Sequence, residues 1–181
     1  YPSVATAINN FGLILAAQGK PVEAEKLLRE ALAQRRKLLG PEHPELAASL
    51  HHLAVLMCKE KNLDEAGRLE REALAMRKKF FGEEHPAVAD SLNNLALIQQ
   101  DEHKLTEAES LFQEAAAMQI KFLGNDHPSL AATLNNLALV LRDQGKFSES
   151  EATLRQVMHI RRKHFGDAHP SVTAAWLELT N

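Results

Sequence analysis

Apolar residues along the chain recur every three or four positions, the spacing that places them on one face of an α-helix. Segments 87–102 and 106–123 show this pattern most clearly. The apolar positions of the two segments are Val88, Leu92, Leu95, Ala96, Ile98 and Ala108, Leu111, Phe112, Ala115, Met118, Phe122. β-branched residues are few and no period-two alternation persists, which argues against strands. The pattern predicts two amphipathic helices joined by a short polar connection.

The two-helix pattern repeats along the whole chain with a constant period of 42 residues. The landmarks with this period are Pro2, Pro44, Pro86, Pro128, Pro170; His43, His85, His127, His169; and Gly40, Gly82, Gly124, Gly166. A fixed period of this length is the signature of a stacked repeat architecture. We predict an all-α fold in a single array over residues 1–181. Its four helix-turn-helix units are expected at 2–43, 44–85, 86–127 and 128–169, with an extra helix at 170–181.

Capping and turn residues recur where helices should begin and end. Proline after histidine suits the first turn of the first helix in each unit, where a missing N–H is harmless. In two of the units, the second helix is expected to open with a capping box, at Thr106–Glu109 and at Ser148–Glu151. In another unit, Asp64 is expected to cap the second helix. We expect left-handed turns between the helices at Gly19 and Gly145, and the same after each second helix at Gly40, Gly82, Gly124 and Gly166.

Small residues occupy fixed places in every unit and let neighbouring helices approach closely. They are Gly12, Ala24, Ala31; Ala54, Ala66, Ala73; Ala96, Ala108, Ala115; and Ala138, Ser150, Val157. This spacing resembles the tetratricopeptide repeat, although the period exceeds the usual 34 residues of that family. The longer unit carries LNNLAL at 92–97 and 134–139, LGPEHP at 39–44 and LGNDHP at 123–128. In this it resembles the repeat of kinesin light chains and related bacterial proteins.

The resemblance implies a right-handed α-solenoid whose concave face is lined by the first helix of each unit. It also implies a non-catalytic scaffold that binds an extended peptide, because asparagine side chains can pair with both the N–H and the C=O of a peptide backbone. The expected groove residues are Asn9, Leu13, His51, Val55, Lys59, Asn93, Leu97, Gln100, Asn135, Leu139 and Arg142. The second asparagine of each pair, at Asn10, Asn94 and Asn136, is expected to serve the structure.

Composition narrows the possible functions. The 181 residues are 45% hydrophobic with a net charge of -3, which is typical of a folded chain and gives no basic footprint for nucleic acid. No apolar run approaches the roughly 18 residues of a membrane-spanning helix. The single cysteine, Cys58, excludes an internal disulfide framework and favours a reducing compartment, so a cytoplasmic location is expected. Because the chain begins at Tyr1, we interpret it as part of a longer array, with possible end-to-end self-association.

Metal binding, cofactor chemistry and catalysis are not expected. Equivalent histidines on neighbouring repeats should lie about 10 Å apart, too far to share a metal, so the landmark histidines are expected to cap helices or pack loops. His51, His52 and Cys58 diverge around a helix, and His51 is interpreted as a groove residue in place of asparagine. No phosphate-binding loop, nucleophile elbow or HExxH motif occurs.

Two further features leave alternatives open. Basic clusters at 35–37, 77–79 and 161–163 could form a ridge for phosphate or acidic lipid, but we interpret them as solvated helix ends that complement the helix dipole. An alternative function is that of a sensor or self-assembly arm of a larger signalling regulator. Trp176 in the extra helix is expected to cover the last full unit.

Overall fold

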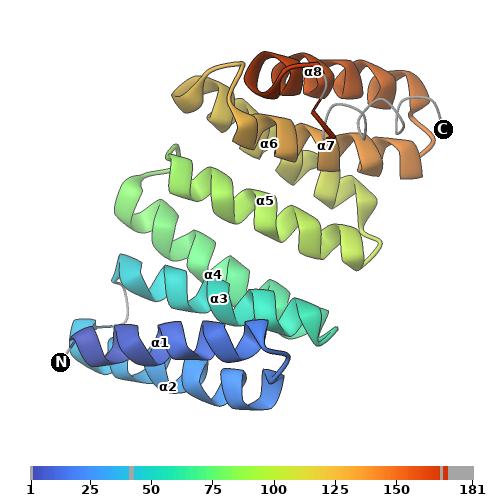
Figure 1. The fold of residues 1–181 in the computed structure, drawn as a ribbon. Helices are drawn as coiled ribbons and strands as arrows, with labels where there is room; N and C mark the ends of the chain where they lie inside the picture. Colours follow the sequence, from blue (N-terminus) through green and yellow to red (C-terminus); the bar gives the residue numbers. More distant parts are fainter. Residues whose placement is uncertain (1, 41–42, 168, 171–181) are drawn as a thin grey trace. The chain divides into compact units, whose positions relative to one another are not determined.

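A computed structural model describes residues 2–40, 43–167 and 169–170. Within those residues the chain forms eight helices and no strand. They are α1 (Pro2–Ala17), α2 (Pro21–Leu39), α3 (Pro44–Lys59), α4 (Leu63–Phe81), α5 (Pro86–Asp101), α6 (Leu105–Leu123), α7 (Pro128–Asp143) and α8 (Phe147–Phe165) (Figure 1). Segments 87–102 and 106–123 are helical to within one residue of the predicted bounds. Trp176 and most of the extra helix lie outside the described residues.

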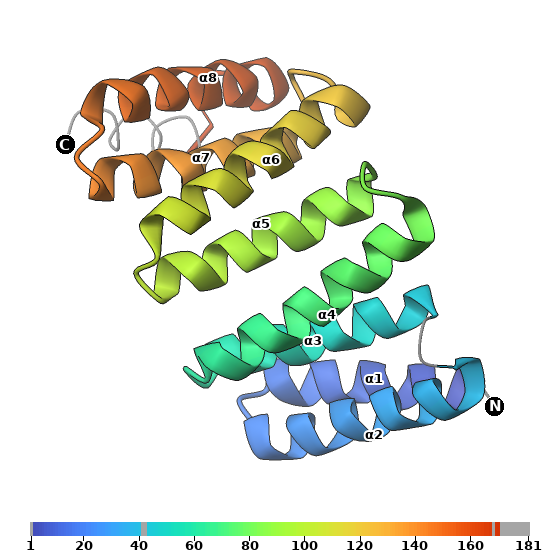
Figure 2. The same cartoon turned by 180° about the vertical axis from the view of Figure 1, so that it is seen from behind.

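The chain divides into two compact units, Tyr1–Glu83 with α1 to α4 and Glu84–Asn181 with α5 to α8. In the first unit α1 packs on α2, α2 on α3 and α3 on α4, and α1 also touches α3. The second unit repeats this scheme with α5 to α8, as both views show (Figures 1 and 2). None of the described helices is long and apolar enough to cross a membrane.

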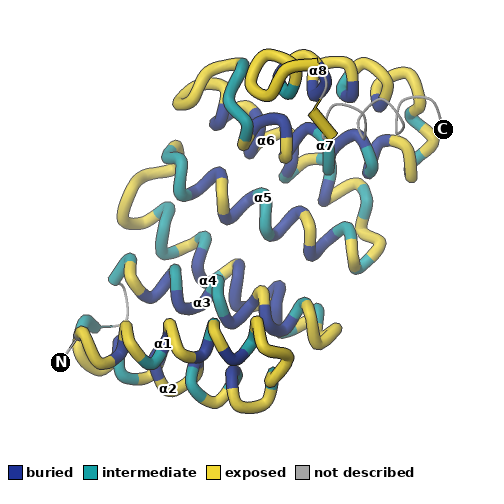
Figure 3. The backbone as a smooth tube through the Cα atoms, viewed as in Figure 1, coloured by how far each residue is buried: buried dark blue, intermediate teal, exposed yellow. Residues whose placement is uncertain are grey.

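The small residues lie where helices of one hairpin meet. All twelve positions of the small-residue pattern are buried, in agreement with the sequence prediction. A Cβ added to Gly12 would lie 3.0 Å from Cγ of Leu28, so α1 approaches α2 too closely for a larger side chain without a shift. In the last hairpin Ser150 Oγ also donates a hydrogen bond of 2.7 Å to the Ala138 carbonyl. Buried positions follow the helical period within each unit (Figure 3).

Histidine caps the first helix of three repeats. The Nδ1 atoms of His43, His85 and His127 accept the backbone N–H two residues later at 3.2, 3.1 and 3.2 Å. Proline follows each histidine in the first helical turn. The predicted capping role of the landmark histidines is therefore confirmed at these three positions. The helix expected after His169 falls on residues outside the described part of the chain.

The turn between the two helices of a hairpin uses one residue with positive φ. Gly19 and Gly145 have φ values of 74° and 78°, as predicted, and Lys61 and His103 adopt 61° and 59° at the equivalent places. Beyond the turn residue Gly145, the Lys146 N–H donates to the Leu141 carbonyl at 2.8 Å, and the Gly145 N–H donates to the Arg142 carbonyl at 2.8 Å. This pair of bonds is a Schellman motif, which ends the first helix and aims the chain into the second.

The predicted capping of the second helices is wrong. Helices α6 and α8 begin one residue before Thr106 and Ser148, and their N-cap residues, Lys104 and Lys146, make no side-chain capping bond. In α4 the cap is Asn62, which accepts from the Glu65 N–H at 3.4 Å, and not Asp64. The Schellman turn fixes where each second helix starts, so the boxes fall inside the first helical turn.

The glycines after the second helices have positive φ but do not form left-handed helical turns. Their φ values run from 79° to 89° with ψ between 164° and 172°. This is the mirror image of extended backbone, a region open almost only to glycine. The sequence prediction therefore has the right sign of φ and the wrong turn, because the backbone at each of these glycines is extended and not helical.

Candidate peptide-binding site

The predicted groove residues lie on the first helices of the hairpins. Helix α1 touches α3 in the first unit and α5 touches α7 in the second, so each unit brings two such helices together.

In the second unit both leading asparagines have their carbonyl oxygen held by the protein. Asn93 Oδ1 of α5 accepts from the Thr133 hydroxyl of α7 at 3.0 Å. Asn135 Oδ1 of α7 accepts from Nη2 of Arg161 of α8 at 3.1 Å. Both asparagines are half-buried. With the oxygen fixed in this way, each side-chain NH₂ group is left to donate to another acceptor.

Aliphatic and long polar side chains accompany these asparagines along α5 and α7. Leu97 is 38% exposed, which is high for a leucine in a helix that packs on two others. Leu139 and Gln100 are half-buried, and Arg142 is exposed with its Nε 4.0 Å from a carboxylate oxygen of Asp143. The second unit thus presents amides, apolar surface and one cation on its first helices.

In the first unit Asn9 differs from its counterparts. It is only 2% exposed, its amide donates to Asn10 Oδ1 at 3.5 Å, and its carbonyl oxygen lies 3.2 Å from Nδ1 of His52. Because both ends of the amide have partners and the side chain is buried, Asn9 does not present a free peptide-binding group. Its burial reflects the close contact of α1 with α3 through His52.

The remaining first-unit groove residues are more accessible. Val55 and Lys59 are exposed and Leu13 is half-buried. His51 is half-buried, and its Nδ1 lies 2.9 Å from Oε2 of Glu70 in α4. Of the second-place residues, Asn10 is exposed, whereas Asn94 and Asn136 are half-buried, and their structural role stays a prediction.

Two arginines of the basic clusters belong to these surfaces and were missed from the sequence. Arg35 of α2 is only 7% exposed. Its guanidinium donates to the Thr6 hydroxyl of α1 at 3.1 Å and to the Ser49 hydroxyl of α3. Arg161 of α8 holds Asn135, as described above. Arg35, Arg77 and Arg161 stand at multiples of the 42-residue period, with Gln119 at this place in the third repeat. This recurrence is the signal that could have found them, but basic neighbours at the helix end masked it.

Several basic residues near the ends of the second helices pair with acidic residues. Lys121 pairs with Glu84 and Lys163 with Asp126, in each case joining a second helix to the loop that precedes its hairpin. Arg36 of α2 pairs with Glu72 of α4. The interpretation of the clusters as solvated helix ends is therefore wrong for the buried Arg35. Lys121 and Lys163 are exposed, and their charges are matched by loop carboxylates.

One histidine beside this surface has a shifted pKa. Burial lowers the pKa of His52, and repulsion from His51, Arg35 and Arg77 lowers it further. The neutral imidazole is therefore favoured, and its Nδ1 can donate to the carbonyl oxygen of Asn9.

Comparison with known proteins identifies the repeat. The family model for the tetratricopeptide repeat matches residues 3–79, 50–118 and 87–163. Among curated proteins no match is found. Two crystal structures of a protein from Podosopora anserina, described as kinesin light chain with nearly identical TPR-like repeats, are each 31% identical with TM-scores of 0.86. This chain is covered to 98% and 99%, and those chains to 84% and 85%.

A third crystal structure, of BtubC (BKLC) from P. vanneervenii, is 25% identical with a TM-score of 0.87, covering 98% of this chain and 71% of that one. Tetratricopeptide repeat proteins generally mediate protein–protein interactions, and their fold is generally non-catalytic. The chain has the helix-turn-helix units of an α-solenoid, which the sequence predicted from its apolar spacing and its small residues. It belongs to the tetratricopeptide repeat family, and its repeats are similar to those of kinesin light chain-like proteins.

Proposed function

We propose that this chain is a non-catalytic interaction scaffold that binds an extended segment of a protein partner along the first helices of its repeats. The residues proposed for the second unit are Asn93, Leu97, Gln100, Asn135, Leu139 and Arg142. Those proposed for the first unit are Leu13, His51, Val55 and Lys59. A cytoplasmic setting is part of the same proposal and rests on the single cysteine, Cys58.

The proposal is carried by the orientation of Asn93 and Asn135. Their carbonyl oxygens accept from Thr133 and Arg161, so their NH₂ groups are held in one direction before a partner arrives. Donors fixed in advance lose little side-chain entropy on binding. Two such donors suit the carbonyls of an extended chain whatever its sequence, while Leu97 gives apolar contact to its side chains.

The experiment that tests this uses an isosteric exchange. In the Asn93→Asp/Asn135→Asp variant an oxygen can still accept from Thr133 and Arg161, but the donating NH₂ becomes a carboxylate oxygen that repels a peptide carbonyl. Random peptides displayed on phage are selected on the natural chain and their affinities measured by fluorescence anisotropy. We expect dissociation constants near 1 μM, or about -8 kcal/mol, and a loss of about tenfold or more in the variant.

The control is Asn136→Asp, which adds one negative charge beside Asn135, against two in the double variant, without touching either fixed donor. Affinity should be nearly unchanged in this control. If the selected peptides bound the double variant as tightly as the natural chain, the asparagines would have no part in binding and the groove assignment would be abandoned.

A further inference from the structure

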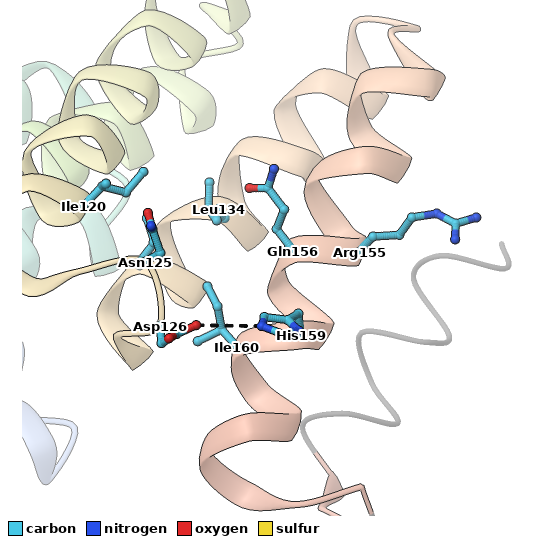
Figure 4. Close-up of a pocket in the computed structure, with 9 residues that line it drawn as sticks. Ile120, Asn125, Asp126, Leu134, Arg155, Gln156, His159 and Ile160 are labelled. Carbon is cyan, nitrogen blue, oxygen red and sulfur yellow. Dashed lines mark ion pairs between the residues drawn. The ribbon is translucent and has the colours of Figure 1, made fainter.

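A pocket of about 540 Å³ lies in the second unit, between α6, the loop after it, α7 and α8 (Figure 4). Its apolar lining comes from Ile120 of α6, Leu130 and Leu134 of α7, and Ile160 of α8. Asn125, in the loop after α6, lies on the α6 side of the pocket, and Gln156 of α8 lies on the other. The volume is within the range of about 300–1,000 Å³ that is common for ligand pockets.

In the first unit an ion pair occupies the corresponding place in the repeat. Arg36 and Glu72 occupy the positions of Ile120 and Gln156 in the first unit, because each stands two full periods, or 84 residues, earlier in the chain. Their side chains pair and join α2 to α4. In the second unit this charged pair is replaced by Ile120, 42% exposed, and by an amide that cannot form an ion pair. The leucines that lie beneath these residues are the same in both units. The two units therefore differ in the side chains that cover the leucines.

The charged groups around the pocket already have partners. Asp126 forms an ion pair with Lys163, which holds the pKa of that carboxyl below its usual range, and His159 lies 3.8 Å from its other oxygen. Arg155 pairs with Glu151 at 2.6 Å, and its side chain points away from the pocket (Figure 4). A charged ligand would therefore find no unmatched charge to compensate its own loss of hydration.

Two uncharged polar groups remain for a ligand. Among the described residues, the side-chain amides of Asn125 and Gln156, both exposed, form no hydrogen bond with another protein group. Each amide can both donate and accept. An apolar lining flanked by two such amides matches an apolar side chain together with the polar backbone on either side of it.

We infer that the pocket lined by Ile120, Leu134 and Ile160 docks an uncharged polypeptide segment of a protein partner. The segment inserts one large aliphatic or aromatic side chain into the pocket and bonds its backbone to Asn125 and Gln156. None of the pocket residues belongs to the proposed groove. The site is therefore a second interaction surface, whose test does not depend on the groove.

The test restores the ion pair of the first unit. In the Ile120→Arg/Gln156→Glu variant, the two residues copy Arg36 and Glu72 and should span the pocket at a place where that pair is already accommodated in this chain. Random peptides displayed on phage are selected on the natural chain, and each enriched peptide is measured on this variant and on Asn93→Asp/Asn135→Asp. Thermal unfolding verifies that both variants are folded.

We expect a class of enriched peptides with one large apolar residue and no charged neighbour beside it. These peptides should lose about tenfold or more in affinity on the Ile120→Arg/Gln156→Glu variant and none on the groove variant. If the Ile120→Arg/Gln156→Glu variant does not fold, the Gln156→Ala variant, which changes an exposed position, gives the same comparison with a smaller expected loss of affinity.

Three results would overturn the inference. The first is a selection in which every enriched peptide binds the pocket variant as well as the natural chain. The second is a dependence on the pocket shown only by peptides with a charged anchor. The third is self-association, measured by sedimentation, that disappears in the pocket variant while no peptide depends on it, because the occupant would then be a second copy of this chain.

Discussion

The carboxylate of Glu70 in α4 is fully buried, and its Oε2 lies 2.9 Å from Nδ1 of His51 in α3. The other three repeats place Leu28, Phe112 and Leu154 at the position of Glu70, all of them buried apolar side chains. The second carboxylate oxygen of Glu70 has no hydrogen-bond partner among the described residues. The second repeat thus holds a polar pair in a place that is otherwise core, and only one of the carboxylate oxygens is satisfied.

Replacing His51 and replacing Glu70 should have different effects on the free energy of unfolding. His51→Ala leaves the buried carboxylate without its partner and should lower the free energy of unfolding by about 3 kcal/mol. Glu70→Leu restores the apolar residue of the other repeats, and should be neutral or raise stability by about 1 kcal/mol, because the half-exposed His51 can then be hydrated. Urea denaturation measures both. A destabilising Glu70→Leu together with a harmless His51→Ala would show that the carboxylate stabilises the hairpin by some other contact.

The two kinds of positive-φ glycine should differ in their tolerance of alanine. Gly145 lies in the left-handed turn, where Lys61 and His103 serve in other repeats, so Gly145→Ala should cost about 1 kcal/mol. Gly124 has φ 86° and ψ 169°, so Gly124→Ala should cost about 2–3 kcal/mol. Thermal or chemical unfolding of the two variants gives the comparison. Equal losses would mean that the loop after α6 relaxes to a conformation that alanine accepts.

The histidine cap of α7 should be replaceable by another acceptor. His127 accepts the Ser129 N–H, and asparagine can do the same from an N-cap position. We expect His127→Asn to retain stability to within a few tenths of a kcal/mol and His127→Ala to lose about 1 kcal/mol. Both are measured by denaturant unfolding. If both substitutions cost the same, the histidine acts through packing of its ring and not through the cap.

His52 should make the first unit less stable in mild acid. Because burial and neighbouring positive charges lower its pKa in the folded state, the unfolded chain binds a proton more readily. The contribution of His52 is fully present above its ordinary pKa of about 6.5 and is lost as the pH falls through the lower folded value. His52→Asn, which copies Asn10, Asn94 and Asn136, should therefore flatten the dependence of stability on pH between about 8 and 5.

The comparison of slopes isolates this residue, because the other eight of the nine histidines are common to both proteins. Unfolding free energies measured at several pH values give each slope. Identical slopes for the natural chain and His52→Asn would mean that His52 is protonated as easily in the folded state as in the unfolded one.

The sequence by itself determined the helical repeat, its period and the position of nearly every helix. Apolar spacing sets which face of a helix is buried, and the His-Pro pair and the glycine of each turn act through neighbouring backbone groups. Such local interactions depend on only a few consecutive residues, so the sequence is enough to predict them. Even so, the capping boxes at Thr106 and Ser148 were wrong, because the Schellman bond from Lys146 to Leu141 sets the start of the helix from the preceding turn.

What only the tertiary structure decided is where each polar side chain of the repeat ends up. Asn9 and Asn93 occupy the same place in the period, yet one is buried against His52 and the other accepts from Thr133. Arg36 and Ile120 likewise share a place, but one bridges two helices and the other borders a pocket. The period specifies the helix face, whereas the partner across the interface, far away in sequence, specifies burial, hydrogen bonding and therefore the chemistry available for binding.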